Sequence, residues 1–183
     1  MVITTDSTYT LLKCNFPPYG KDFQGGLATG RFSDGRVPSD LIAEKLGLAK
    51  SLPAFMSPNL KPQEILKGVT FASGGTGYDP LTAMPVGCVP LQRTVFGGLF
   101  TRGCFEPLNN MAKQFNARLS PALESLDKEL DGVIFYIDVY DTLFDMIQLR
   151  SSSYIFWDSY HPTDRAYQVI VDNLLDKYLS KIY

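Results

Sequence analysis

The chain has 183 residues, of which 45% are hydrophobic and 20% charged, and its net charge at pH 7 is −2. This composition is typical of one folded globular domain, so we expect a single domain over residues 1–183. No apolar run approaches the ~20 residues of a transmembrane helix. No cluster of lysine and arginine indicates a surface for nucleic acid or for anionic membranes.

The first twenty residues do not have the pattern of a secretory signal. MVITTDSTYTLLKCNFPPYG has no basic start, no continuous apolar stretch and no small-residue cleavage site. On this segment alone, we expect no signal peptide and an intracellular form of the protein.

A loop and a short helix are the first predicted elements. Residues 14–38 are rich in Gly, Pro, Asp and aromatic residues, which predicts a long ordered surface loop. Ser39 then offers an N-cap for a short helix, and Gly47 offers its end.

A glycine cluster follows the first predicted strand. Residues 68–73, GVTFAS, are rich in β-forming residues and run directly into GGTG at residues 74–77. A strand that ends in glycines can present backbone N–H groups to a ligand, as in many α/β proteins. The cluster also suits a plain tight turn, because glycine adopts positive φ without steric cost.

Three further elements complete the pattern. An apolar stripe at helical spacing predicts a helix over residues 108–130, interrupted where Ser120 caps a new first turn at Pro121. Residues 132–140, GVIFYIDVY, suit a buried parallel strand. Residues 163–178 carry the apolar face of a last helix. Alternating strands and helices predict an α/β layered domain.

The single histidine lies near a carboxylate, in YIFWDSYHPT at residues 154–163. Pro162 suits the first position of the last helix, which places Asp158 and His161 in the loop before it. An aspartate three residues before a histidine can accept its Nδ1–H, fix the tautomer and leave Nε2 free as a general base. By spacing alone, a histidine that only caps the helix or packs beside Trp157 explains the pattern at least as well.

The three cysteines, Cys14, Cys88 and Cys104, are too few for a disulfide scaffold and match no zinc pattern. Cys88 and Cys104 could pair in an oxidising compartment and leave Cys14 free, or all three could be thiols. With one histidine and no Cys-x-x-Cys, the sequence predicts no metal site and no cofactor.

Four segments together resemble the plant GDSL esterases/lipases, which are SGNH-type hydrolases. They follow the family order from Lys13 to the end of the chain: KCNFPPYGKDFQGGLATGRFSDGRVPSDLIAEKLGL, GVTFASGGTGYDPLT, PVGCVPLQR and YIFWDSYHPTDRAYQVIVDNLL. The resemblance implies a flavodoxin-like three-layer α/β/α sandwich with a mostly parallel sheet. It also implies a secreted hydrolase of small-molecule or lipid carboxylic esters.

The resemblance assigns roles to particular residues. In D-x-x-H-P-T, His161 would be the general base and Asp158 the residue that orients it, while a serine in a G-D-S block attacks the ester. A second-block glycine and an asparagine of a G-x-N-D block would form the oxyanion hole. Gly74, directly after FAS, is a better match for that glycine than Gly75.

Two blocks of the family pattern are missing. The nearest string to GDS is Asp6-Ser7 in TDST, which lies too close to Cys14 and has no preceding glycine and no adequate strand before it. We therefore identify no nucleophile, because a nucleophile must be held by a rigid element within reach of the base. The absence of G-x-N-D indicates a central deletion near residues 83–84, and a second junction lies near residues 150–151. Exon loss, or a gene model with skipped exons, explains both, and the sheet would then be incomplete.

Three functions remain open on the sequence. The first is a GDSL-type ester hydrolase with impaired activity. The second is a catalytically inactive family member that binds a lipid, an ester or a protein partner. The third, a nucleotide or flavin binder that uses GGTG as a phosphate cradle, is the weakest, because GGTG is not G-x-G-x-x-G. The oligomeric state is not predicted.

Overall fold

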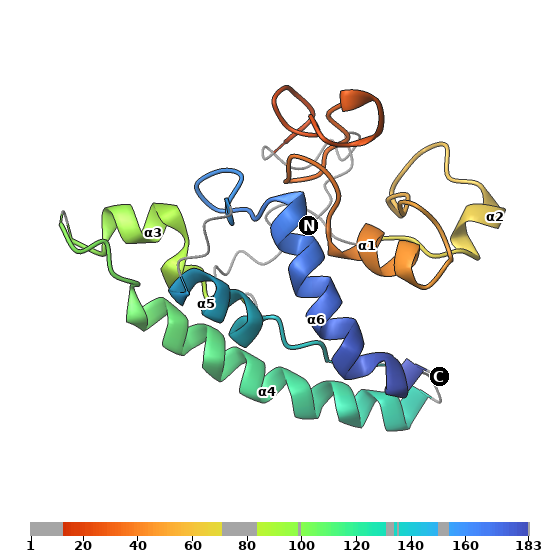
Figure 1. The fold of residues 1–183 in the computed structure, drawn as a ribbon. Helices are drawn as coiled ribbons and strands as arrows, with labels where there is room; N and C mark the ends of the chain where they lie inside the picture. Colours follow the sequence, from red (N-terminus) through yellow and green to blue (C-terminus); the bar gives the residue numbers. More distant parts are fainter. Residues whose placement is uncertain are drawn as a thin grey trace. The chain divides into compact units, whose positions relative to one another are not determined.

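The computed structural model describes residues 13–70, 84–98, 100–130, 134, 136–149 and 154–182. These residues fall into two compact units, one made of Met1–Tyr78 with Ser153–Tyr183 and the other of Asp79–Ser152. Their helices are shown in Figure 1. In chain order they are η1 Gln24–Gly26, α1 Pro38–Lys45, α2 Pro62–Ile65, η2 Val86–Cys88, α3 Pro90–Val95, α4 Glu106–Leu130, α5 Tyr140–Gln148 and α6 Asp164–Ile182.

The first unit is built on the packing of α1 against α6. Leu41 of α1 and Ile170 and Val171 of α6 are buried. Burial of an aliphatic side chain of this size contributes about 1.5–3 kcal/mol, so the packing of each of these residues stabilises the unit. An ion pair between Lys45 and Asp172 joins the same two helices near the surface. The last helix, predicted over 163–178, is confirmed and continues to Ile182.

The ends of α1 differ in how well the sequence predicted them. Pro38 occupies the first turn, and Oδ2 of Asp40 accepts the N–H of Val37 at 3.1 Å, so the predicted cap by Ser39 is wrong. Gly47 ends the helix as predicted, with φ of +70° and its N–H donated to the carbonyl of Glu44. Glycine adopts this conformation without steric cost.

The predicted loop over residues 14–38 contains η1 as a regular element and ends where α1 begins at Pro38, but residues 30–35 of it are buried rather than on the surface. Buried Arg31 explains the difference. Its Nε lies 2.7 Å from Oδ2 of Asp40 and its Nη2 lies 2.8 Å from Oδ1. The Asp40 side chain is 0% exposed. A buried charge requires a partner of this kind, so the polar residues of the loop are part of the interior.

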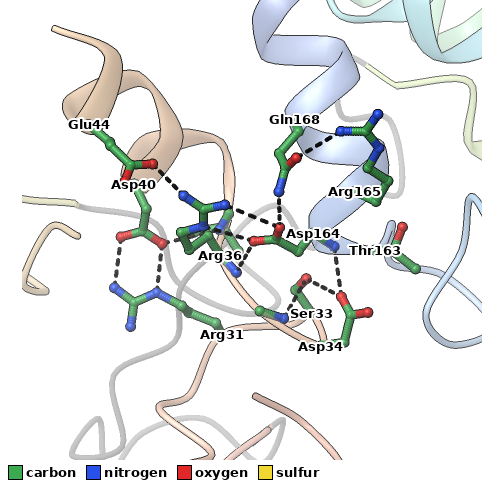
Figure 2. Close-up of polar contacts among 12 residues, drawn as sticks. Arg31, Ser33, Asp34, Arg36, Asp40, Glu44, Thr163, Asp164, Arg165 and Gln168 are labelled. Atoms are coloured by element: carbon green, nitrogen blue, oxygen red, sulfur yellow. Dashed lines mark hydrogen bonds and ion pairs between the residues drawn. The ribbon is translucent and has the colours of Figure 1, made fainter. Parts of the chain in front are cut away.

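The same loop is bonded to the first turn of α6 (Figure 2). Oδ1 of Asp34 accepts the N–H of Asp164 at 2.7 Å, and Oδ1 of Asp164 accepts the backbone N–H of Arg36 at 2.6 Å. Nε of Arg36 lies 3.1 Å from the same carboxylate oxygen, and Gln168 also donates to the Asp164 carboxylate. These bonds fix the start of α6 relative to the loop.

The second unit centres on the contacts of η2 with α3 and α4. Asn109 of α4 is fully buried, where its Oδ1 accepts the N–H of Gly87 at 2.9 Å and its Nδ2 lies 3.2 Å from Sγ of Cys88. Cys88 forms a disulfide with Cys104. Of the two alternatives for the cysteines, the structure thus has the paired one, and Cys14 is a buried free thiol.

The long helix α4 runs through Pro121 without interruption, so the predicted break at Ser120 is wrong. A proline removes one backbone donor, and the helix continues on both sides of it. Its apolar stripe is not fully covered, since Met111 and Phe115 are 45% and 43% exposed. No helix in the described part of the chain has both the length and the apolar character needed to cross a membrane.

The predicted sheet is not seen in the described residues, whose bridges Ala54–Thr70 and Phe156–Pro162 are isolated. Residues 134 and 136–139 form no regular structure, and Tyr140 begins α5, so the predicted strand over 132–140 is wrong at these positions. A buried parallel strand needs neighbours that satisfy its N–H and C=O groups. In this segment the N–H of Ile134 instead donates to the side chain of Asp127 in α4, at 2.6 Å from its Oδ1. Residues 71–73 and the GGTG cluster lie outside the described residues.

Candidate active site

Asp158 and His161 lie in a tight turn before α6. The N–H of Trp157 donates to the carbonyl of His161 at 2.7 Å, and the N–H of Thr163 donates to the carbonyl of Ile155 at 2.9 Å. These two bonds pair the chain before the turn with the chain after it. The turn residues between them are therefore held at a fixed place at the start of α6.

The helix start differs from the prediction. Pro162 is not the first helical residue, because it forms the bridge to Phe156 and α6 begins at Asp164. Thr163 caps the helix instead, with its Oγ1 accepting the N–H of Ala166 at 3.1 Å. A threonine cap contributes about 0.5–2 kcal/mol.

The carboxylate of Asp158 binds its own turn and the imidazole together. Its Oδ1 accepts the N–H groups of Tyr160 and His161, both at 2.7 Å. Nδ1 of His161 lies 2.8 Å from Oδ2 and 3.1 Å from Oδ1. Because an ionised carboxylate only accepts hydrogen bonds, we assign the proton to Nδ1, which leaves Nε2 of the neutral ring without one.

Asp158 is ionised at neutral pH. Burial raises its pKa, but hydrogen bonds from the side chain and backbone of His161 and from the hydroxyl of Tyr19 outweigh burial and lower the pKa to about 2. A carboxylate that orients a basic histidine must remain charged, and Asp158 meets this condition.

The lowered pKa makes a prediction for acid unfolding. The pKa of Asp158 is about 2 in the folded protein against an ordinary value of 3.8. Its contribution to stability is therefore complete above the ordinary value and is lost as the pH falls through the folded one. We expect a loss of ~2 kcal/mol from this group between about pH 5 and pH 2. Urea unfolding of the wild type and Asp158→Asn at both pH values should show the smaller fall in the variant, and equal falls would contradict the prediction.

Aromatic rings surround the pair. The ring of Phe32 lies 4.5 Å from the imidazole of His161, and the ring of Tyr160 lies 5.7 Å from it. The side chains of His161 and Asp158 are 21% and 26% exposed. The pair is thus half-buried, which strengthens its electrostatic interaction while leaving it open to solvent.

The other predicted site residues lie outside the described residues. Gly74 and its alternative Gly75 are among them, so the oxyanion-hole role stays a prediction, and Ser7, to which no role is assigned, also lies there. Within the described residues, no hydroxyl is bonded to Nε2 of His161, whose ring nitrogen contacts are to Asp158. No cluster of His, Cys, Asp or Glu in the described ranges could hold a metal ion.

Sequence reasoning missed Tyr19. Its hydroxyl donates to Oδ2 of Asp158 at 2.8 Å, although the two residues are 139 positions apart. Tyr19 belongs to NFPPYG, residues 15–20, which the composition assigned only to a loop. The presence of this segment in the family resemblance was the one signal that could have drawn attention to it.

A histidine oriented by an ionised carboxylate is the arrangement with which serine hydrolases activate a nucleophile. The family model described as GDSL-like Lipase/Acylhydrolase matches residues 78–174. The chain is 50% identical over 301 aligned positions to GDSL esterase/lipase At1g59030 of Arabidopsis thaliana, covering 95% of this chain and 86% of that protein. It is 52% identical over 232 positions to GDSL esterase/lipase At3g43550 of the same plant, covering 76% and 81%. The chain therefore belongs to the plant GDSL esterase/lipase family, and by family it is a carboxylic ester hydrolase.

The alignment with At1g59030 is longer than the chain itself. The 301 positions aligned with At1g59030 exceed the 183 residues of the chain, so that relative carries stretches with no counterpart here. No solved structure matches the chain.

Proposed function

We propose that this chain acts on carboxylic esters of small molecules or lipids, with His161 as general base and Asp158 as the residue that orients it. The observation that carries the proposal is the 2.8 Å contact between Nδ1 of His161 and Oδ2 of Asp158. With Nδ1 bonded to the carboxylate, Nε2 is free to take a proton from a hydroxyl or from water. The imidazolium that forms would be stabilised by the same carboxylate.

The proposed activity is weak. The sequence contains neither G-D-S nor G-x-N-D, so we assign no serine nucleophile and no oxyanion-hole asparagine. Loss of a triad serine leaves only a residual enhancement of ~10³–10⁴ over water, and loss of one oxyanion-hole donor costs ~10²–10³ more. Gly74 is the one oxyanion-hole donor that we assign, by its place in the second block. We therefore expect turnover far below that of relatives with both blocks.

We also propose that segments of the family domain are deleted near residues 83–84 and 150–151. Two observations support this. The alignment with At1g59030 is longer than the chain, and the two junctions lie close to the boundaries between the compact units, after Tyr78 and after Ser152. A deleted central segment would also remove the neighbours that a strand over 132–140 requires. Sequencing the gene and transcript across both junctions tests this, and a gene without intervening coding sequence would contradict exon skipping.

The test of ester hydrolysis compares the wild type with His161→Gln on p-nitrophenyl butyrate. Glutamine keeps a polar side chain near Asp158 but is no base. We expect slow turnover above the buffer rate in the wild type and none in the variant, with circular dichroism to show that both are folded. Equal rates in the two proteins would contradict hydrolysis by this site.

The second candidate function is binding without turnover, and the missing nucleophile block favours it. Trp157 is the only tryptophan and lies in the turn that carries Asp158, so its fluorescence reports on this site. Two results together would support binding without turnover. The wild type and His161→Gln would hydrolyse the ester at equal rates, and an ether analogue of a lipid ester would change the emission of Trp157.

We propose an oxidising compartment for the protein, in keeping with the secretion that the family resemblance implies. The disulfide between Cys88 and Cys104 supports this location, because such bonds persist in secreted proteins and are rare in the cytosol.

A further inference from the structure

We infer that Tyr19 is a positioning residue of this site, whose hydroxyl holds Oδ2 of Asp158 and thereby the tautomer of His161. The hydroxyl donates to Oδ2 at 2.8 Å, from a loop 139 residues earlier in the chain. The catalytic meaning of this contact rests on the proposed function, whereas the contact and its effect on the imidazole can be tested without turnover.

Tyr19 has a distinct place among the donors to this carboxylate. Oδ1 accepts the backbone N–H groups of Tyr160 and His161, which belong to the turn itself. Oδ2 accepts the tyrosine hydroxyl and lies 2.8 Å from Nδ1 of His161. Among the described residues, Tyr19 is the donor from outside the turn. Without it, the imidazole would be the one partner that the described residues give to Oδ2, and water would compete for the free lone pair.

The ring of Tyr19 is held by other aromatic rings. It meets Phe16 edge-on at 5.4 Å, and it also contacts Phe32 at 6.1 Å and Trp157 at 6.5 Å. Phe32 in turn lies beside the imidazole of His161. Edge-to-face contacts of this kind contribute about 0.5–1.5 kcal/mol each beyond burial, so the ring has little freedom to leave the carboxylate.

The backbone after Tyr19 is fixed as well. The N–H of Gly20 donates to the carbonyl of Ser33 at 3.1 Å, and its φ is +72°. A Cβ at this position would lie 2.2 Å from the carbonyl oxygen of Leu27, so only glycine fits here. The chain therefore turns directly after Tyr19, with the phenol at a fixed place.

The protonation of Tyr19 suits a donor. Burial raises its pKa, and the hydrogen bond to Asp158 raises it further. The hydroxyl thus keeps its proton throughout the neutral range, where the carboxylate is ionised.

The test uses the single histidine of the chain, which gives one set of imidazole ¹⁵N resonances. Tyr19→Phe removes one oxygen atom and keeps the ring. We expect the ratio of the Nδ1–H to the Nε2–H tautomer of neutral His161 to fall about fivefold, the factor that corresponds to one net hydrogen bond. Turnover of p-nitrophenyl butyrate should fall by a similar factor in kcat, with KM unchanged.

Tyr160→Phe is the matched control. The ring of Tyr160 lies 5.7 Å from the same imidazole, but only its backbone N–H is bonded to Asp158. We expect its tautomer ratio to equal that of the wild type. An unchanged ratio in Tyr19→Phe, or equal changes in both variants, would overturn the inference.

The two proposals fail in different ways. A tautomer shift in Tyr19→Phe without wild-type turnover would contradict hydrolysis and leave the positioning role standing. Turnover that depends on His161, without a tautomer shift in Tyr19→Phe, would support hydrolysis and overturn the positioning role of Tyr19. If Tyr19→Phe does not fold, the wild type gives a second measurement. A slowly exchanging tyrosine hydroxyl proton with a nuclear Overhauser contact to Nδ1–H is expected, and its absence would overturn the inference.

Discussion

Replacement of Arg31 by leucine is expected to destabilise the first unit by ~3–5 kcal/mol, because it leaves the carboxylate of Asp40 buried without a counter-charge. The guanidinium also donates to Oγ1 of Thr29 at 2.9 Å and to the carbonyl of Leu52 at 3.1 Å. Native domains are stable by only about 5–15 kcal/mol, so this loss is a large share of the total. Urea unfolding followed by Trp157 fluorescence measures it within the same unit.

Two further variants make the Arg31 experiment specific. Arg31→Lys keeps the charge but not the two parallel bonds to Asp40, so we expect an intermediate loss of stability. Arg165→Leu removes an exposed arginine of α6 that donates to Oε1 of Gln168 at 3.1 Å. It is expected to change stability by less than ~0.5 kcal/mol. Similar losses in Arg31→Leu and Arg165→Leu would contradict the importance of the buried pair.

Replacement of Asp158 by asparagine is expected to abolish the slow turnover that depends on His161, so that the rate falls to that of the buffer, as it does when the histidine itself is lost. Asparagine has nearly the same shape, and its carbonyl oxygen can still accept the backbone N–H groups of Tyr160 and His161. Its amide, however, donates toward Nδ1 and favours the tautomer that carries the proton on Nε2. The base is then already protonated at the atom that must accept.

The assay for Asp158→Asn is the hydrolysis of p-nitrophenyl butyrate between pH 6 and pH 8. Asp141→Asn, at an exposed position in the first turn of α5, is the control and should keep the wild-type rate. Turnover of Asp158→Asn within about twofold of the wild type would show that the carboxylate does not orient the base.

The parts of the structure that depend on nearby residues could be predicted from the sequence. The end of α1 at Gly47 follows from local turn chemistry, and the last helix follows from its apolar face. The contact between Asp158 and His161 spans three residues, so a spacing argument reaches it. The interpretation of this contact as a catalytic pair came from the family resemblance, because the same spacing is common in proteins without such a pair.

The remaining features depend on partners far along the chain. The burial of Arg31 requires the Asp40 carboxylate and the Leu52 carbonyl, and the composition of its loop indicated only a surface. The donor from Tyr19 to Asp158 has no local signal at all. At residues 136–139 the apolar run indicated a strand, but such a run does not specify which neighbour would pair with it. The continuation of α4 through Pro121 is another case, because a proline weakens a helix without always ending it.

The hydrogen bond from the N–H of Asp164 to Asp34 closes a loop of 130 residues, and it has a consequence for synthesis on the ribosome. Residues 13–70 leave the ribosome long before α6 does. The part of the first unit that contains Arg31 and Tyr19 therefore remains unfolded until α6 has been synthesised. Contacts this distant in sequence form slowly, and the exposed apolar surface invites association with other nascent chains. A chaperone that binds this early segment is therefore expected to raise the yield of folded protein, and a stop codon before residue 158 to leave it unfolded.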